Sequence, residues 1–215
     1  MNSLITLVHG IGLAYAAGLN LYAAVAVTGL AVRLGWLESV PSSIAAFGNL
    51  WVIVIASALY LLEFTATLVP GVASAWETLH SVIRPPAAAM LAAATAWHAD
   101  PIIVLVAALL GGALAATTHT TKLGLRYAID ASPEPVTNAI ANTAELTVVA
   151  AIAIAIWHHP FITLTIAIVL LIALVMIVRL IWRALRQVFS GHWMPAPGFL
   201  QAPRTMERRV SAEEE

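Results

Sequence analysis

Ionisable and amide side chains recur at helical spacing along three segments that are otherwise apolar. Within each segment the members of this polar stripe lie three or four residues apart, which places them on one face of a helix. The stripes are Glu77, His80 and Arg84; His119, Lys122 and Arg126; and Glu134, Asn138, Asn142 and Glu145. Carboxylates and imidazoles can carry protons, and the cations can bind an anion. Because such groups are costly in lipid unless paired or hydrated, we expect the stripes to face one another across a bundle interior or a wet cavity.

Two carboxylates lie deep within apolar sequence. Glu63 follows two leucines and precedes a phenylalanine, and Glu145 lies well inside an apolar helix. Their charges need partners, and Arg84 and Arg126 are the expected ones. The alternative for Lys122 and Arg126 is that they extend to the lipid headgroups at a cytoplasmic helix end.

Asn20 lies near the middle of the first apolar segment, two residues after Gly18. One interpretation is an unwound point whose freed backbone groups line a binding site, as in the broken helices of transporters. The other is helix packing, because Gly10, Ala14 and Gly18 have the spacing of a small-residue interface. The sequence leaves both open.

Two proline motifs adjoin the polar stripes. Pro85 and Pro86 follow Arg84, and Glu134 lies between two prolines. Proline removes a backbone donor, so we expect both motifs to interrupt helices. A helix that begins near Pro135 would direct its positive N-terminal end at a cytoplasm-facing anion site. A hinge or a helix cap explains the same prolines.

The composition defines the elements that must position these residues. Of 215 residues 61% are hydrophobic and 10% are charged, with a mean hydropathy of +0.91. Soluble domains have about a quarter of their residues charged, and several uncharged runs reach the ~20 residues of a membrane-crossing helix. The sequence therefore predicts an all-α, polytopic membrane protein with about six transmembrane segments and Pro-broken or re-entrant elements. The expected segments are 4–32, 49–69, 72–97 (spanning or re-entrant), 101–121, 135–157 and 161–188.

The same reasoning assigns 1–189 to a transmembrane domain and 190–215 to a disordered polar tail, whose prolines and charges cannot form a core. Segments 49–97 and 101–157 each end in a Trp-His turn, which suggests an internal repeat of the kind seen in transporters. Chance similarity among Ala/Leu-rich helices is the alternative.

Basic residues indicate the orientation, because cytoplasmic loops are enriched in them. Placing Lys122, Arg126 and the arginines at 179, 183 and 186 inside makes both termini cytoplasmic. Residues 99 and 159 are then outside. Four tryptophans fall at the expected outer ends of helices, where indoles prefer to lie: Trp36, Trp51, Trp97 and Trp157.

Several classes of function are excluded or disfavoured. A net charge of −1 without a basic patch argues against nucleic-acid binding. The absence of cysteine removes thiol chemistry, and no zinc-protease, nucleophile-elbow or phosphate-loop motif occurs. We therefore expect no cofactor and no metal, and we favour a protein without enzymatic activity over an enzyme.

Specific motifs extend over residues 10–150. They are 18–22, 61–64, 70–71, 76–80, 83–87, Gly111 and Gly112 with His119 and Lys122, and 132–135 with Asn138. Together they resemble a bacterial membrane family known as domain of unknown function 4126. The resemblance implies a multi-pass protein of a bacterial inner membrane but no activity. In that family an acidic pair often occurs where this chain has Ala144 and Glu145, so the resemblance implies that one carboxylate is missing here.

The expected function is that of a small transporter or channel-like protein, with a polar cavity open to the cytoplasm. Its ligand would be anionic or zwitterionic, for example a lipid headgroup, and its carboxylates and histidines would permit proton coupling. The expected cavity residues are Asn20, Glu63, Glu77, His80, Arg84, His119, Lys122, Arg126, Glu134, Asn138, Asn142 and Glu145. The expected partners are the lipid bilayer and a second copy in a homodimer. The alternatives are an assembly factor that binds a partner protein through its polar faces, and a lipid-modifying enzyme with a Glu/His pair as acid and base.

Overall fold

Every element of the described chain is helical, as expected for an all-α protein. The structure, a computed structural model, describes residues 3–37, 39–69, 71–130 and 135–189. Contacts divide the chain into two compact units, Met1–Met176 and Ile177–Glu215. Every polar-stripe residue that the structure describes lies in the first unit.

The first apolar segment forms two helices instead of one. Helix α1 covers Ser3–Leu19 and α2 covers Leu21–Arg33. Between them Asn20 has an extended backbone (φ −149°, ψ 108°), and its side chain accepts a hydrogen bond from the Ala23 amide. The single helix expected over 4–32 is therefore wrong, and the chain is unwound at Asn20 as one interpretation expected; that this point lines a binding site stays a prediction.

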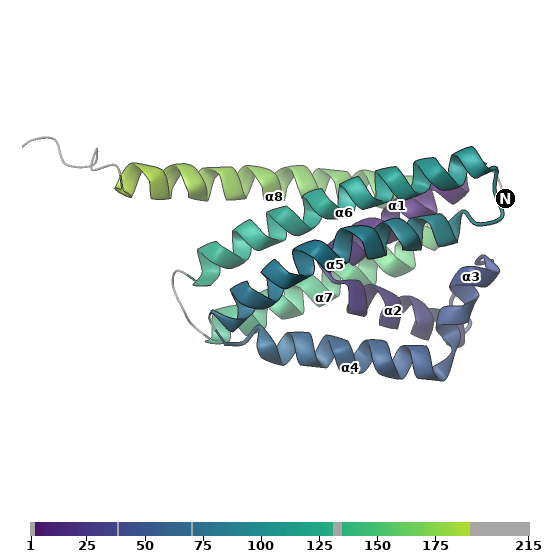
Figure 1. Ribbon diagram of the computed structural model, residues 1–215, viewed down its shortest axis with the longest axis horizontal. Coiled ribbons are helices and arrows are strands. Elements are labelled where there is room, and N and C mark those ends of the chain that lie inside the picture. Colours follow the sequence, from purple (N-terminus) through teal and green to yellow (C-terminus); the bar gives the residue numbers. More distant parts are fainter. Residues whose placement is uncertain (1–2, 38, 70, 131–134, 190–215) are drawn as a thin grey trace, which may run out of the picture. The chain divides into compact units, whose positions relative to one another are not determined.

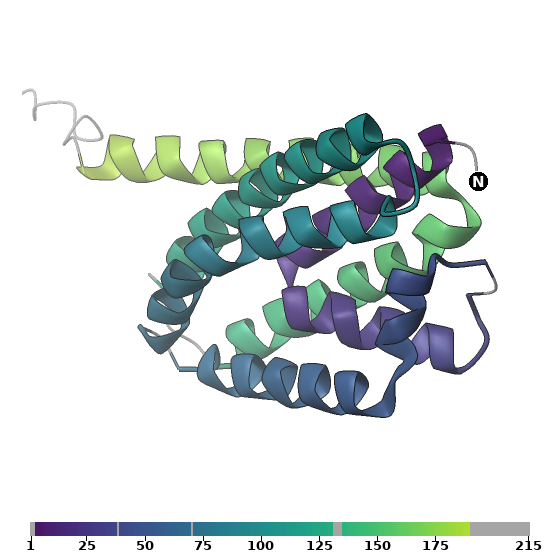
Figure 2. The same cartoon turned by 45° about the vertical axis from the view of Figure 1, so that its right-hand side comes forward.

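The two helices form a helical hairpin. Near the start of α1 the ring of His9 lies 4.5 Å from that of Trp157. At the end of α2, Arg33 donates to the Gly48 carbonyl, close to the short helix in which Ser42 lies 3.1 Å from His98. Figures 1 and 2 show α1 running from the N-terminal side into the bundle and α2 turning back beside it. The segment expected to cross the membrane once therefore begins and ends at the same end of the bundle.

The remaining elements follow in chain order. They are α3 (Ser42–Ala45), the 3-10 turn η1 (Ala46–Gly48), α4 (Leu50–Ala66), α5 (Val72–Thr95), α6 (Pro101–Asp130), α7 (Pro135–His158) and α8 (Pro160–Phe189). By length and composition α6, α7 and α8 could each cross a membrane. The pair formed by 42–48 and 50–66, bent by 71°, would be a fourth span.

The structure thus contains three to four candidate spans; the six expected spans are not confirmed, and the internal repeat stays a prediction. Helix α5 falls short in hydropathy because it carries Glu77, His80 and Arg84. Its 24 residues nevertheless extend about 36 Å at 1.5 Å per residue, which exceeds the ~30 Å thickness of a hydrocarbon core.

The prolines at 85 and 86 do not interrupt α5, which continues from Val72 to Thr95. The expected break is therefore wrong. In a membrane bundle, neighbouring helices can stabilise a helix that lacks one or two backbone donors, and α5 packs closely against α1 and α6. Pro133 and Glu134 lie outside the described residues, and α7 begins at Pro135 as expected.

Glycines bring α1 close to its neighbours. A Cβ atom on Gly18 would lie 2.7 Å from the Cα of Ala115 in α6, and one on Gly10 would lie 3.0 Å from the carbonyl oxygen of Ala92 in α5. Such contacts leave no room for a side chain. The packing interpretation of these glycines is confirmed alongside the helix break: α1 is held close enough for its last residues to reach the polar stripes.

Candidate functional site

The polar stripes of α5 and α6 face the interior of the first unit. Glu77, His80 and Arg84 expose at most 1% of their surface. Between them, Leu79 and Val82 point outward and are 58% and 76% exposed. This pattern follows from helical spacing, because the charged residues share a face that the apolar residues do not.

Arg84 is bonded to four groups. Its Nη2 lies 2.5 Å from Oε1 of Glu63, and its Nη1 lies 2.9 Å from Oε2 of Glu77. Nη1 also donates to the Leu19 carbonyl at 2.9 Å and lies 3.1 Å from Nδ1 of His119. The ion pair expected between Glu63 and Arg84 is therefore present, with Glu77 as a second carboxylate partner.

Lys122 contacts three carboxylates. Its Nζ lies 2.8 Å from Oε1 of Glu77, 2.8 Å from Oε1 of Glu145 and 3.4 Å from Oε1 of Glu63. It also donates to the Leu19 carbonyl at 2.9 Å. Since the ammonium group lies inside the bundle, the headgroup alternative is wrong for Lys122.

Arg126 binds amides instead of the carboxylate expected for it. Its Nη1 and Nη2 donate to Oδ1 of Asn138 and Oδ1 of Asn142, at 3.1 and 2.6 Å. Asn142 in turn donates to Oγ1 of Thr67 at 2.9 Å. Arg126 is 3% exposed, so it does not extend to headgroups; it connects α6 with α7 and, through Asn142, with the end of α4. Glu145 binds Lys122 instead of one of the two arginines that were expected as partners.

Asn20 joins the helix break to the charges. Its Nδ2 donates to Oε1 of Glu63 and Oε1 of Glu145, both at 2.9 Å. Because the Ala23 amide bonds to Oδ1 of Asn20, the Leu19 carbonyl loses its helical donor and becomes free to accept from Arg84 and Lys122. One residue therefore caps α2, orients two carboxylates and frees a backbone acceptor for two cations.

We use "charge cluster" for Glu63, Glu77, Arg84, Lys122 and Glu145. With three carboxylates and two cations its formal charge is −1. The helices position every member by packing, and Glu145 is the most accessible carboxylate, with 13% of its side chain exposed against 3% for Glu63.

A small crevice adjoins the charge cluster. It is too narrow to hold a water molecule and is lined by Asn20, Glu63, Glu145 and Tyr60, among others. Within the described part of the chain, Oε2 of Glu63 and the Tyr60 hydroxyl are buried without a hydrogen-bond partner. The wide polar cavity that was expected is not seen in this part, because the charged side chains fill the space themselves.

The two histidines of the stripes differ in their surroundings. His119 adjoins the charge cluster, with Nε2 3.0 Å from the Ser81 hydroxyl. His80 points to the other side, where its Nε2 lies 3.1 Å from the Tyr22 hydroxyl and its ring stacks on Trp76. No group of three or more His, Cys, Asp or Glu side chains among the described residues is arranged to hold a metal ion.

Eleven of the twelve expected cavity residues can be placed. Asn20, His119 and the charge cluster meet at one point, whereas Arg126, Asn138 and Asn142 form a neighbouring group; His80 faces away, and Glu134 is not described. Sequence reasoning missed the hydroxyls of Tyr22, Tyr60 and Thr67 and the Leu19 carbonyl. Uncharged hydroxyls stand out little in a hydropathy pattern, although Tyr22 ends the motif that contains Asn20.

Comparison with known proteins supports the resemblance inferred from the motifs. The model of a family described as "Domain of unknown function (DUF4126)" matches residues 7–180. This range includes most of α1, the whole of α2 and the whole charge cluster. No curated protein and no solved structure matches the chain.

Proposed function

This chain belongs to the DUF4126 family, whose description assigns no activity, so we propose a function from its geometry. The protein would be a proton-coupled transporter or channel-like protein for a small anionic or zwitterionic substrate. It would lie in the inner membrane of a bacterium. The observation that carries the proposal is the charge cluster at the unwound point between α1 and α2. Ionisable groups at such depth mark ion pathways and proton relays in membrane proteins.

Protonation would exchange one set of partners for another. A proton on Glu145 removes one carboxylate partner of Lys122, and a second proton on Glu63 removes one partner of Arg84. The formal charge of the charge cluster then changes from −1 to +1, and both cations become available to a carboxylate or phosphate group. Proton and anion would therefore bind together, which is the requirement for coupled movement.

The burial of the charge cluster favours this role over the assembly-factor alternative. Its polar groups bind one another inside a single chain, and among the residues that the structure describes no polar stripe is exposed to a partner protein. A buried ion-pair network is also poor evidence of stabilisation, because apolar side chains of similar volume often serve as well.

The proposal predicts anion-dependent proton movement. Protein would be reconstituted into vesicles that contain a pH-sensitive dye, with inorganic phosphate or glycerol 3-phosphate added outside. We expect acidification of the lumen that requires the protein and that Glu145→Gln abolishes, because this carboxylate is the accessible proton acceptor. The control is Asp100→Asn, in an exposed turn where the side chain only caps α6. Flux that is independent of both anions, or that is unchanged in Glu145→Gln, contradicts the proposal.

We also propose a revised orientation. Arg179, Arg183 and Arg186 are exposed on the last helix, whereas Lys122 and Arg126 are buried and no longer count as loop charges. The orientation inferred from the positive-inside rule then depends on the three arginines, which place the C-terminal end of α8 in the cytoplasm. Because α1 and α2 re-enter from the end that contains the 96–100 turn, the N-terminus would lie outside instead of inside.

Reporter fusions test this orientation. Reporters at Ser3 and at residues 99 and 159 should all be read outside, and one after Phe189 should be read in the cytoplasm. An N-terminal reporter in the cytoplasm together with an outside reading at residue 99 would mean that 3–33 crosses the membrane and that the re-entrant course is wrong.

A further inference from the structure

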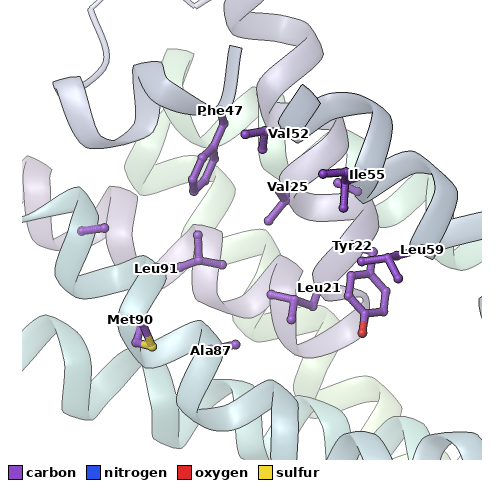
Figure 3. Close-up of a pocket in the computed structure, with 12 residues that line it drawn as sticks. Leu21, Tyr22, Val25, Phe47, Val52, Ile55, Leu59, Ala87, Met90 and Leu91 are labelled. Carbon is purple, nitrogen blue, oxygen red and sulfur yellow. The ribbon is translucent and has the colours of Figure 1, made fainter. Parts of the chain in front are cut away.

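An apolar groove lies between α2, α4 and α5, away from the charge cluster (Figure 3). Its volume is about 520 Å³, within the ~300–1,000 Å³ that ligand pockets usually have. Helix α2 lies between the two walls formed by α4 and α5. Among the lining residues are Leu21 and Val25 of α2, Ile55 and Leu59 of α4, and Met90 and Leu91 of α5.

The groove opens sideways. Ile55 on one wall is 57% exposed and Met90 on the other is 73% exposed, and Figure 3 shows them on opposite sides of Leu21 and Val25. In a protein with several helices apolar enough to cross a membrane, such an opening between two helices faces lipid chains instead of water.

The lining is suited to hydrocarbon. None of its residues is charged, and Tyr22 is the only one with a polar side-chain atom. That hydroxyl is already engaged, since it lies 3.1 Å from Nε2 of His80. A headgroup or an ion would therefore find no partner in the groove, whereas a hydrocarbon chain would leave no polar group unpaired.

The direction and length of the groove match one leaflet. Its walls run along α4 from Val52 to Leu59 and along α5 from Ala87 to Ala94. Each stretch advances about 10 Å at 1.5 Å per residue, which is most of the ~15 Å that half a hydrocarbon core provides. The end at Ala94 lies near the 96–100 turn, and the other end reaches Tyr22 in the middle of the bundle.

We infer that this groove binds one hydrocarbon chain of a bilayer lipid, from the leaflet on the side of the 96–100 turn. The site goes beyond the proposed transport and does not require it. The start of α2 would then connect the groove with the charge cluster, because the residues that directly follow Asn20 line the groove while Asn20 itself binds the charge cluster. A bound chain would hold α2 against α4 and α5.

The test is photolabelling in vesicles that contain phosphatidylglycerol with a diazirine near the middle of one chain, followed by mapping of the labelled peptides. We expect label concentrated on the groove side of α4 and α5, and little on Leu109 and Leu110 of α6, although these are 64% and 48% exposed. Ala87→Trp fills the groove from α5 and should lose most of this label. Ala113→Trp, on an exposed face of α6, should keep it.

Leu59→Trp fills the groove from the opposite wall and should also lose most of the label, so it serves if Ala87→Trp fails to fold. Labelling in proportion to exposure on every helix, or label that both filling variants retain, overturns the site. A groove that takes up no label in the wild-type protein is covered by something other than lipid, such as a second copy of the chain, and would overturn the lipid-chain assignment as well.

Discussion

Arg84→Ala should lower the thermal stability of the protein more than any surface substitution. The change leaves Glu63 and Glu77 in the interior with Lys122 as their remaining cation, and it removes one donor from the Leu19 carbonyl. Removing one partner of a buried ion pair typically costs about 3–5 kcal/mol. Thermal melts in detergent measure the loss. Arg33→Ala is the matched control, because this arginine is exposed and donates to one carbonyl only.

A double substitution shows whether the effect comes from the ion pair. Glu63→Gln should partly restore the stability of Arg84→Ala, because it removes the stranded charge. A lysine at this position, Arg84→Lys, should restore little, since one ammonium group cannot reproduce the planar guanidinium group, which donates from both Nη1 and Nη2. If the two single effects simply add to within about 0.5 kcal/mol, the usual limit for independent sites, the pair does not couple and the network as described is wrong.

The polar half of the site could be predicted because membrane energetics and helical spacing constrain it strongly. Residues three or four positions apart share a helix face, and no such face can carry Glu77, His80 and Arg84 toward lipid. The same cost implied a cation beside Glu63, and Arg84 is that cation. These inferences needed only local sequence and the properties of the solvent.

Pairings between helices could not be predicted, because they depend on how far one helix is shifted along another. Gly18 packs against Ala115, and this contact brings Leu19 and Asn20 level with Lys122. Glu145 consequently meets Lys122 instead of Arg126. A shift of α7 by one turn would place Glu145 beside Arg126 instead, and nothing in the apolar pattern distinguishes the two arrangements.

The course of the first segment was hidden for a related reason. Hydropathy measures whether residues suit lipid but not the direction in which a chain runs, so 4–32 looked like one crossing. The reversal depends on Asn20, whose amide replaces a helical hydrogen bond and ends α1. Pro85 and Pro86 show the converse: strong local break signals remain inside α5, because tertiary packing outweighs local preference.

The homodimer expected from the small size of the chain stays a prediction.

Substitutions of Asn20 should separate its capping role from its bridging role. Asn20→Ala removes the cap of α2, worth about 0.5–2 kcal/mol, and two hydrogen bonds to carboxylates, each worth about 1.5–3 kcal/mol. Asn20→Ser keeps a good cap and loses only the bridge, so we expect it to be destabilised somewhat less than Asn20→Ala. Thermal melts of the variants under one detergent condition give this order.

Asn20→Asp gives the sharpest contrast, since aspartate caps a helix as well as asparagine does. It replaces the donor that binds Glu63 and Glu145 with a further carboxylate, so the local formal charge becomes −2 and like charges lie in contact. We therefore expect Asn20→Asp to be less stable than Asn20→Ala, and Glu145→Gln to restore part of the loss. If capping alone explained Asn20, the aspartate variant would melt like the wild type. That result would separate the helix break from the charge cluster and remove the structural basis for coupling the two.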